Sequence, residues 1–228
     1  MFSNKQALLF DLDGTLVDSV GDLHTAINTM LDAFNAPSVG EDQVREWVGN
    51  GSLRLVERAL SYTKNVDASF KTVNLTTAHD HFLTAYSDTH HANTRLCKGV
   101  KETLTYFAEC RLLMAVITNK PLQFVPELLE AQGIDQFFDM VLGGDSLAEK
   151  KPSPIPLLFA SEELGIPIEN CLMIGDSESD ILAAKAAGMQ SVILSDGYHQ
   201  GMDVTSMGAD AVIDSVDALI GLVNDSSN

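Results

Sequence analysis

The sequence predicts an α/β fold: an open, doubly wound parallel sheet with a helical unit inserted after its first strand. Short apolar runs without polar alternation recur along the chain, as in strands buried on both faces of a parallel sheet. Segments of helix length separate most of these runs, which gives the β-α-β-α order of an α/β fold. The stretch 18–95 interrupts this order, because it holds helix-like patterns and no comparable strand.

Six apolar runs are the predicted strands, and four segments between them are the predicted helices. The strands are expected at residues 7–10, 112–117, 140–142, 171–174, 191–194 and 211–213. The helices are expected at residues 100–110, 121–132, 156–164 and 179–187. Gly133, Gly165 and Gly188 follow the last three helices, at the position where glycine commonly ends a helix.

The stretch 18–95 is predicted to be a helical cap. Apolar residues recur at helical spacing from Leu23 to Phe34 and again over residues 53–60. We therefore expect a core domain made of residues 1–17 and 96–228, with the cap domain inserted into it.

The composition is typical of a globular protein and excludes several classes of partner. Hydrophobic residues make up 45% of the 228 residues and charged residues 20%. The 14 basic and 32 acidic residues give a net charge of −18, which disfavours nucleic acid and anionic membrane surfaces as partners. Three cysteines without CxxC spacing and the lack of a long apolar run favour a cytoplasmic protein. The oligomeric state stays open between monomer and homodimer.

Acidic side chains follow the first and fourth predicted strands. Asp11 and Asp13 come directly after the first, and Asp176 and Asp180 follow the fourth. Ligands of open parallel sheets bind at the carboxyl ends of the strands, so we expect all four carboxylates in one cleft. Carboxylates placed so close repel one another unless a cation intervenes, and Mg²⁺ is the expected metal. Taken singly, each residue is also explained as a turn or as an acid in the first turn of a helix.

Four motifs, in order along the chain, resemble those of the haloacid dehalogenase-like phosphatases. Residues 11–19 (DLDGTLVDS) look like the first motif, and residues 117–120 (ITNK) resemble the second. Residues 151–154 (KPSP) are similar to the third motif and residues 175–180 (GDSESD) to the fourth, acidic one. The resemblance spans the whole chain and implies a Rossmann-like core with an inserted cap.

The resemblance implies a role for each acidic residue. Asp11 would be the nucleophile that forms an aspartyl-phosphate. Asp13 would protonate the leaving alkoxide and later deprotonate the hydrolytic water, which favours phosphoryl transfer over dehalogenation. Mg²⁺ would be held by the carboxylates of Asp11 and Asp176 and the backbone carbonyl of Asp13, with Asp180 supporting this shell.

The resemblance also implies the groups that bind phosphate. Thr118, Asn119 and the backbone N–H groups at the start of the helix expected from residue 121 would bind phosphoryl oxygens. Lys151 would offset the charge of Asp11 and of the transferring group. Its neighbour Lys150 is the alternative; we assign Lys151, because it directly precedes the Pro-x-Pro, and expect Lys150 to be a solvated charge.

The cap segment resembles that of the phosphoglycolate phosphatases within this family. The similarity lies in residues 47–51 (WVGNG) and 57–60 (ERAL), and it implies 2-phosphoglycolate, a small phosphorylated organic acid, as the substrate. Its carboxylate needs a donor in the cap. The candidates are the loop of Gly49, Asn50 and Gly51, together with Arg58 or Arg54, whereas Trp47 is expected to anchor the cap core.

Other functions stay open. A β-phosphoglucomutase-like phosphomutase shares the cap and all four motifs. A pyrophosphatase or a broad sugar-phosphate phosphatase of the same superfamily is a closer alternative. A non-catalytic interaction protein would show a broken catalytic set, and none of the expected residues is missing. The pair His79 and His81 could suggest zinc, but a polar surface is the preferred interpretation.

Overall fold

A six-stranded parallel sheet forms the centre of the computed structural model, which describes residues 2–67, 69–71 and 73–223. The strand order is β5-β4-β1-β6-β7-β8, and every neighbouring pair is parallel. The six predicted strands are present within one residue at each end. Their bounds are β1 (Ala7–Phe10), β4 (Leu113–Ile117), β5 (Met140–Leu142), β6 (Cys171–Gly175), β7 (Gln190–Leu194) and β8 (Ala211–Ile213).

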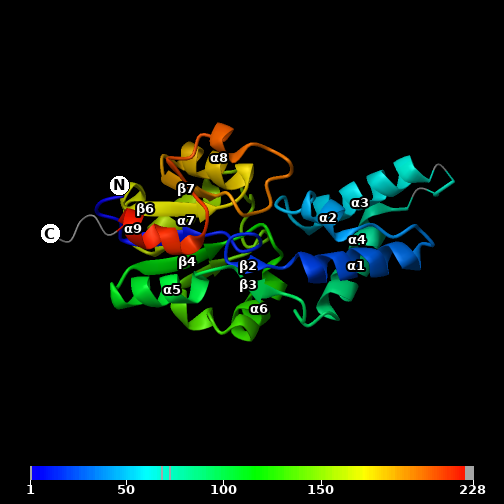
Figure 1. Ribbon diagram of the computed structural model, residues 1–228, viewed down its shortest axis with the longest axis horizontal. Helices are drawn as coiled ribbons and strands as arrows, with labels where there is room; N and C mark the ends of the chain where they lie inside the picture. The colour runs from blue at the N-terminus through cyan, green and yellow to red at the C-terminus, as the bar shows by residue number, and fades with distance from the viewer. Residues whose placement is uncertain (1, 68, 72, 224–228) are drawn as a thin grey trace.

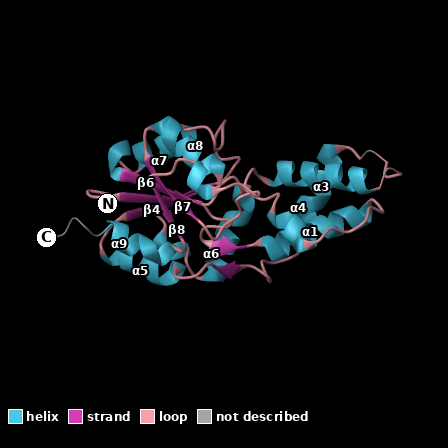
Figure 2. Ribbon diagram, turned by 45° about the horizontal axis from the view of Figure 1, so that its top comes forward, coloured by secondary structure: helices cyan, strands magenta, loops and turns pink. Residues whose placement is uncertain are grey.

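Helices cover both faces of the sheet, as a doubly wound fold requires (Figures 1 and 2). On one face lie α5 (Val100–Glu109), α6 (Val125–Gln132) and α9 (Leu219–Val223). On the other lie α7 (Ile155–Glu163) and α8 (Glu178–Ala187). Short 3₁₀ turns join these elements at Leu122–Phe124, Asp135–Phe137, Ile168–Asn170, Val204–Ser206 and Val216–Ala218. The helix expected from residue 121 therefore begins later than predicted, as α-helix only from Val125.

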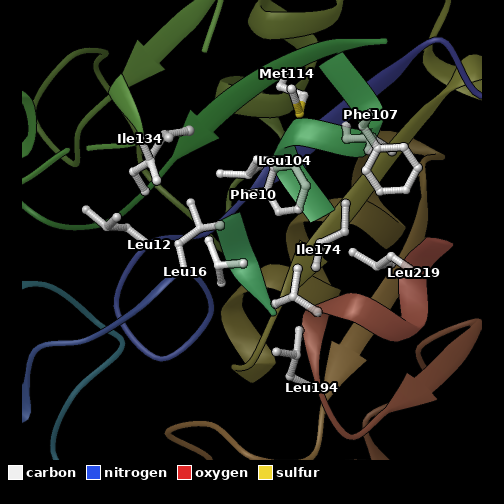
Figure 3. Close-up of a cluster of buried hydrophobic side chains, with 14 of the residues drawn as sticks. Phe10, Leu12, Leu16, Leu104, Phe107, Met114, Ile134, Ile174, Leu194 and Leu219 are labelled. Atoms are coloured by element: carbon white, nitrogen blue, oxygen red, sulfur yellow. The ribbon is translucent and has the colours of Figure 1, made fainter. Parts of the chain in front are cut away.

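Alternation along the strands divides the core into two layers. Leu8 and Phe10 of β1 point to the α5 side, where Phe10 lies with Leu104 and Phe107 in a fully buried cluster (Figure 3). Ala7 and Leu9 of the same strand point to the α7 side. Because both faces of β1 are covered, its sequence reads as one uninterrupted apolar run.

The stretch predicted as a cap is helical and projects from one end of the sheet (Figure 1). It contains α1 (Val20–Ala33), α2 (Glu41–Arg45), α3 (Ser52–Val66) and α4 (Leu75–Ser87). These helices share their own apolar cluster, in which Trp47 is buried as expected. Among the described residues, no histidine belongs to a group of three or more possible metal ligands, and His79 instead contacts Ser52 Oγ at 2.8 Å.

Two short strands connect the helical part to the sheet. β2 (Val17–Asp18) and β3 (Arg95–Leu96) pair antiparallel at the two boundaries that the sequence predicts for the cap. The buried carboxylate of Asp22, on α1, accepts hydrogen bonds from the backbone N–H of Asn93 (3.1 Å) and from Thr94 Oγ1 (2.6 Å). These hydrogen bonds thus hold the first turn of α1 against the segment that leads from the helical part back to β3.

Two further features bear on the expectations from composition. Within the described part of the chain, no helix is both long and apolar enough to cross a lipid bilayer. Cys97, Cys110 and Cys171 are all free thiols. Residues 224–228, which the predicted core domain includes, lie outside the described residues.

We predict that Asp22→Ala lowers the free energy of unfolding by about 2–3 kcal/mol, because it leaves the buried hydroxyl of Thr94 and the backbone N–H of Asn93 without an acceptor in the protein. Urea denaturation measures the loss. Asp32→Ala is the matched control, since Asp32 lies exposed on the same helix and should change stability by less than about 0.5 kcal/mol. Equal effects of both substitutions would contradict a structural role for Asp22.

Candidate active site

The candidate site lies where the strand order of the sheet changes direction. β1 lies between β4 and β6. The strands that follow β4 and β6 are added on opposite sides of β1, β5 beside β4 and β7 beside β6. Asp11, Thr118 and Asp176 directly follow β1, β4 and β6. The backbone N–H of Asp11 donates to the carbonyl of Ile174 at 2.9 Å, which keeps the first residue after β1 level with β6. Crevices at such switch points are the usual ligand sites of open α/β sheets.

Three carboxylates converge at this edge of the sheet. Asp11, Asp176 and Asp180 each offer an oxygen within 4.8 Å of the others, and all three are buried. The ammonium of Lys151 lies among them, 2.9 Å from Asp11 Oδ1 and 2.6 Å from Asp180 Oδ1. One buried cation therefore faces three buried acids.

Hydrogen bonds fix the two acids that come from the β6–α8 segment. Asp176 Oδ2 accepts from the backbone N–H of Tyr198 at 2.6 Å, and Asp176 Oδ1 accepts from Thr15 Oγ1 at 3.3 Å. Asp180 Oδ2 accepts from both the backbone N–H and the hydroxyl of Ser177, at 3.0 and 2.6 Å. Asp180 thus closes a capping box at the N-terminus of α8 while its other oxygen faces Lys151.

Glycines leave just enough room for these carboxylates. A Cβ on Gly14 would lie 2.0 Å from Asp176 Oδ2, and one on Gly197 would lie 2.3 Å from the Cβ of Asp176. A Cβ on Gly175 would lie 2.4 Å from Asp180 Oδ2. Gly14 also has a φ of +88°, which favours glycine. The backbone approaches the acids too closely for any other residue at these positions.

The electrostatics of the cluster favour a bound cation. Burial, together with the charge of Asp180, raises the pKa of Asp11 from 3.8 to about 6, although Lys151 opposes this. Burial and the charges of Asp11 and Asp180 likewise raise the pKa of Asp176 well above its usual value. The oxygen donors, their spacing and their mutual repulsion fit a hard divalent cation.

The Asp13 carboxylate lies outside this group of three acids, although Asp13 lines the same cavity as Asp11. Its oxygens lie 3.0 and 3.3 Å from Lys120 Nζ, and Ser19 Oγ donates to Oδ1 at 2.5 Å. The reason is local: β1 ends at Phe10, and the chain turns through Gly14, whose N–H bonds Val17 O. Strand alternation therefore does not relate Asp11 to Asp13.

Lys120 is a functional candidate that the sequence analysis did not single out. Its side chain is buried, pairs with Asp13 and lies over the Tyr86 ring, 4.5 Å from the centroid. Burial alone would lower the pKa of Lys120, but Asp13 and then Tyr86 raise it above its usual value. The sequence feature that could have indicated Lys120 is its position two residues after Thr118, just beyond the end of a predicted strand.

Core side chains hold a loop of the cap by three consecutive backbone carbonyls. Gln200 Nε2 donates to Val48 O at 2.7 Å, and Asn119 Nδ2 donates to Gly49 O at 3.1 Å. Lys150 Nζ donates to Asn50 O at 2.9 Å. The expectation that Lys150 is a solvated charge is therefore wrong, because its ammonium bridges the core to the cap loop.

Arg58 and Asn50 lie behind this loop. Arg58 donates to Trp47 O and to Asn50 Oδ1, both at 2.6 Å. Neither residue is among the described residues that line the cavity next to Asp11. Arg54 pairs with Glu57 on the exposed side of α3. The structure thus places the arginines proposed for the substrate carboxylate outside the cavity, and makes Arg58 a brace of the loop.

A cavity of about 40 Å³ lies between the core and the cap. Core residues supply its chemistry: Asp11, Asp13, Thr118, Asn119 and Lys120. Cap residues supply a mostly apolar wall that includes Leu23, Leu55 and Phe82, with Gly49 and Gly51 at the loop. Thr118, assigned to phosphate binding, is buried beside Asp11, and its hydroxyl accepts from the backbone N–H of Lys120 at 3.2 Å.

Residues 8–194 match the family described as haloacid dehalogenase-like hydrolase. The chain belongs to this family. The four motifs predict this assignment from the sequence, and it is confirmed, as is the predicted fold class. The match runs from β1 to the end of β7 and so includes every acid of the cluster.

Family members similar to this chain include named phosphatases. A relative from Colwellia psychrerythraea, named phosphoglycolate phosphatase, is 42% identical over 216 residues, which cover 95% of this chain and 96% of the relative. The structure of a predicted phosphoglycolate phosphatase from Haemophilus somnus has a TM-score of 0.92 at 34% identity, covering 96% and 98% of the two chains. The structure of CbbY from Rhodobacter sphaeroides in complex with phosphate has a TM-score of 0.79 at 26% identity, covering 94% and 96%.

We predict that a divalent cation stabilises the protein more at high pH than at low pH. Without a cation, the raised pKa of Asp11 favours the folded state fully below about pH 3.8, and this contribution is lost as the pH rises through about 6. A cation needs the ionised carboxylates, so it competes with protons. With Mg²⁺ at a hundred times its Kd, Tm should rise by about 5–10 °C near pH 8 and by much less near pH 5.

Two variants test whether this effect comes from the cluster. Asp176→Asn should remove most of the Mg²⁺-induced shift in Tm. Asp196→Asn should keep it, because Asp196 is exposed and outside the cluster. An equal shift at both pH values, or an unchanged shift in Asp176→Asn, would contradict a cation site at these three carboxylates.

Proposed function

We propose that this protein hydrolyses 2-phosphoglycolate to glycolate and phosphate, with Mg²⁺ as cofactor and an aspartyl-phosphate on Asp11 as intermediate. The Colwellia relative, named phosphoglycolate phosphatase, supports the substrate. The observation that carries the reaction class is the pairing of Asp11 with Lys151 at the switch point of the sheet. This pairing sits beside a cavity that also contains Asp13.

Asp11 is the proposed nucleophile. Lys151 holds Oδ1 at 2.9 Å, while the same ammonium donates to Ile117 O and so fixes the orientation of the carboxylate. Attack by an Asp11 oxygen on phosphorus breaks the bond to the ester oxygen and forms the acyl phosphate. Mg²⁺, held by Asp11, Asp176 and the carbonyl of Asp13 with support from Asp180, would neutralise charge on the carboxylates and the phosphoryl oxygens. Thr118, Asn119 and Lys151 are the proposed phosphoryl-binding residues.

Asp13 is the proposed acid and base. It lines the same cavity as Asp11, and Ser19 and Lys120 hold its carboxylate. A proton from Asp13 to the ester oxygen lets glycolate leave as an alcohol, and the carboxylate then takes a proton from the water that hydrolyses the acyl phosphate. Two carboxylates with separate partners thus carry two separate roles.

We propose that residues 18–95 act as a cap domain over a core domain of residues 1–17 and 96–228. The contacts of Asn119, Lys150 and Gln200 with the loop 48–50 support this division, since they join the two parts at a loop that lines the cavity. Exclusion of bulk water protects the intermediate until its own hydrolysis. The three free thiols support a reducing compartment, the cytoplasm.

We predict that Asp11→Asn lowers kcat for phosphate release from 2-phosphoglycolate by about 10³-fold or more, because the amide cannot form the acyl phosphate. Thermal melting should show that the variant stays folded, since Asn keeps the shape of the side chain. Near-normal turnover by folded Asp11→Asn would remove this residue from its role. An isomerised sugar from β-glucose 1-phosphate, without free phosphate, would instead favour the phosphomutase.

We predict that a chelator of divalent cations abolishes phosphate release and that added Mg²⁺ restores it. The reason is the repulsion among the three buried carboxylates, which one lysine does not neutralise. Activity of the purified enzyme is measured before chelation, after it and after addition of Mg²⁺. Full turnover in excess chelator would contradict the role of the cation.

A further inference from the structure

Lys120 carries a positive charge in the cavity, and the proposed mechanism uses it only to hold Asp13. Of the described residues that line the cavity, Lys120 is the only one with a cationic side chain. Asp11 and Asp13 are the two acids in the lining. The proposed substrate brings a carboxylate in addition to its phosphate. A buried carboxylate without a cation or hydrogen-bond donors is costly, so it needs a partner in this cavity.

The other cations near the site already have partners and lie outside the described cavity lining. Lys151 is enclosed between Asp11 and Asp180. Lys150 donates to the carbonyl of Asn50, and Arg58 braces the same loop from behind. None of these three side chains is in the cavity lining described by the structure.

The position of Lys120 suits a carboxylate near the ester oxygen. Its ammonium lies 3.0 and 3.3 Å from the two carboxylate oxygens of Asp13, the group proposed to protonate that oxygen. In 2-phosphoglycolate the carboxylate carbon is two bonds from the ester oxygen. A carboxylate so close to the ester oxygen is within reach of the Lys120 ammonium, because that ammonium contacts Asp13, the proposed proton donor to the same oxygen. An ammonium has three N–H donors on a flexible stem, so it can serve Asp13 and a second acceptor.

The rest of the described cavity wall offers no second cationic side chain: its other donors, such as Ser52 and the loop residues Gly49 and Gly51, are neutral. Leu23, Leu55 and Phe82 line the cap side, and the ring of Tyr86 packs against the Lys120 ammonium at 4.5 Å. This ring stabilises the buried cation by a cation–π contact. A carboxylate placed farther from the ester oxygen would meet these apolar side chains instead of the ammonium.

We propose that Lys120 is a specificity-determining residue whose ammonium binds the substrate carboxylate, so that the site selects phosphate esters of 2-hydroxy carboxylic acids. This inference rests on the proposed function and deepens it. The substrate carboxylate accepts a hydrogen bond from the Lys120 ammonium next to Asp13, so one cation binds both carboxylates. Esters without a carboxylate at that position leave Lys120 paired with Asp13 alone.

The test compares two substrates that differ only in the carboxylate. Ethyl phosphate has the two-carbon chain of 2-phosphoglycolate with a methyl group in place of the carboxylate. The wild type should prefer 2-phosphoglycolate. Lys120→Met should lower the ratio of the two kcat/KM values by about 10- to 100-fold, mainly through KM for 2-phosphoglycolate, because one charge-assisted hydrogen bond is lost.

A matched lysine variant and a second substitution at residue 120 complete the experiment. Lys185→Met removes an exposed ammonium on α8 that lies outside the cavity lining, so it should keep the substrate ratio of the wild type. If Lys120→Met does not melt cooperatively, Lys120→Gln makes the same comparison with a neutral polar side chain. An unchanged ratio in a folded Lys120 variant, with equal losses on both substrates, would overturn the proposal and limit Lys120 to orienting Asp13. A wild type without any preference for 2-phosphoglycolate would overturn the proposed function itself.

Discussion

Repulsion among three buried carboxylates is the constraint on which the rest of this structure depends. Asp11, Asp176 and Asp180 lie close together out of contact with bulk water, and Lys151 supplies one positive charge among them. Such a group is tolerable only when hydrogen bonds, a cation and a rigid frame hold it. The parallel sheet supplies this frame, because it brings the ends of β1 and β6 side by side at its centre.

The first two acids of the first motif, Asp11 and Asp13, each have their own lysine. Asp11 pairs with Lys151 and Asp13 with Lys120, although only one residue separates the two acids in the chain. This separation keeps the Asp11 carboxylate among the three buried acids and directs that of Asp13 to Lys120. The turn through Gly14 produces it, because the extended backbone of β1 does not continue past Phe10. A sharp turn thus gives two neighbouring acids different surroundings, which is the basis of the separate roles proposed for them.

The sequence was sufficient for the sheet and for most of the acid cluster, since both follow from local patterns. A run such as 7–10 is apolar because both faces of β1 are buried, and Asp11 and Asp176 come directly after such runs. The orientation of Asp13 and the contacts of Lys120 and Lys150 could not be predicted in this way. The orientation of Asp13 depends on the turn through Gly14. The contacts of Lys120 with Tyr86 and of Lys150 with Asn50 depend on how the helical part meets the sheet, which residue spacing does not encode.

The loop at residues 48–50 meets the core through main-chain oxygens, which Gln200, Asn119 and Lys150 bind in turn. Every amino acid carries such an oxygen, so these three hydrogen bonds by themselves do not require particular side chains in the loop. Gly49 and Gly51, with φ of +117° and +87°, are the exceptions. Asn50 is a further constraint, because its side-chain oxygen accepts from Arg58 and from Gln200. A substitution in this loop therefore keeps the three main-chain acceptors, but at residue 50 it also removes the acceptor that these two donors share.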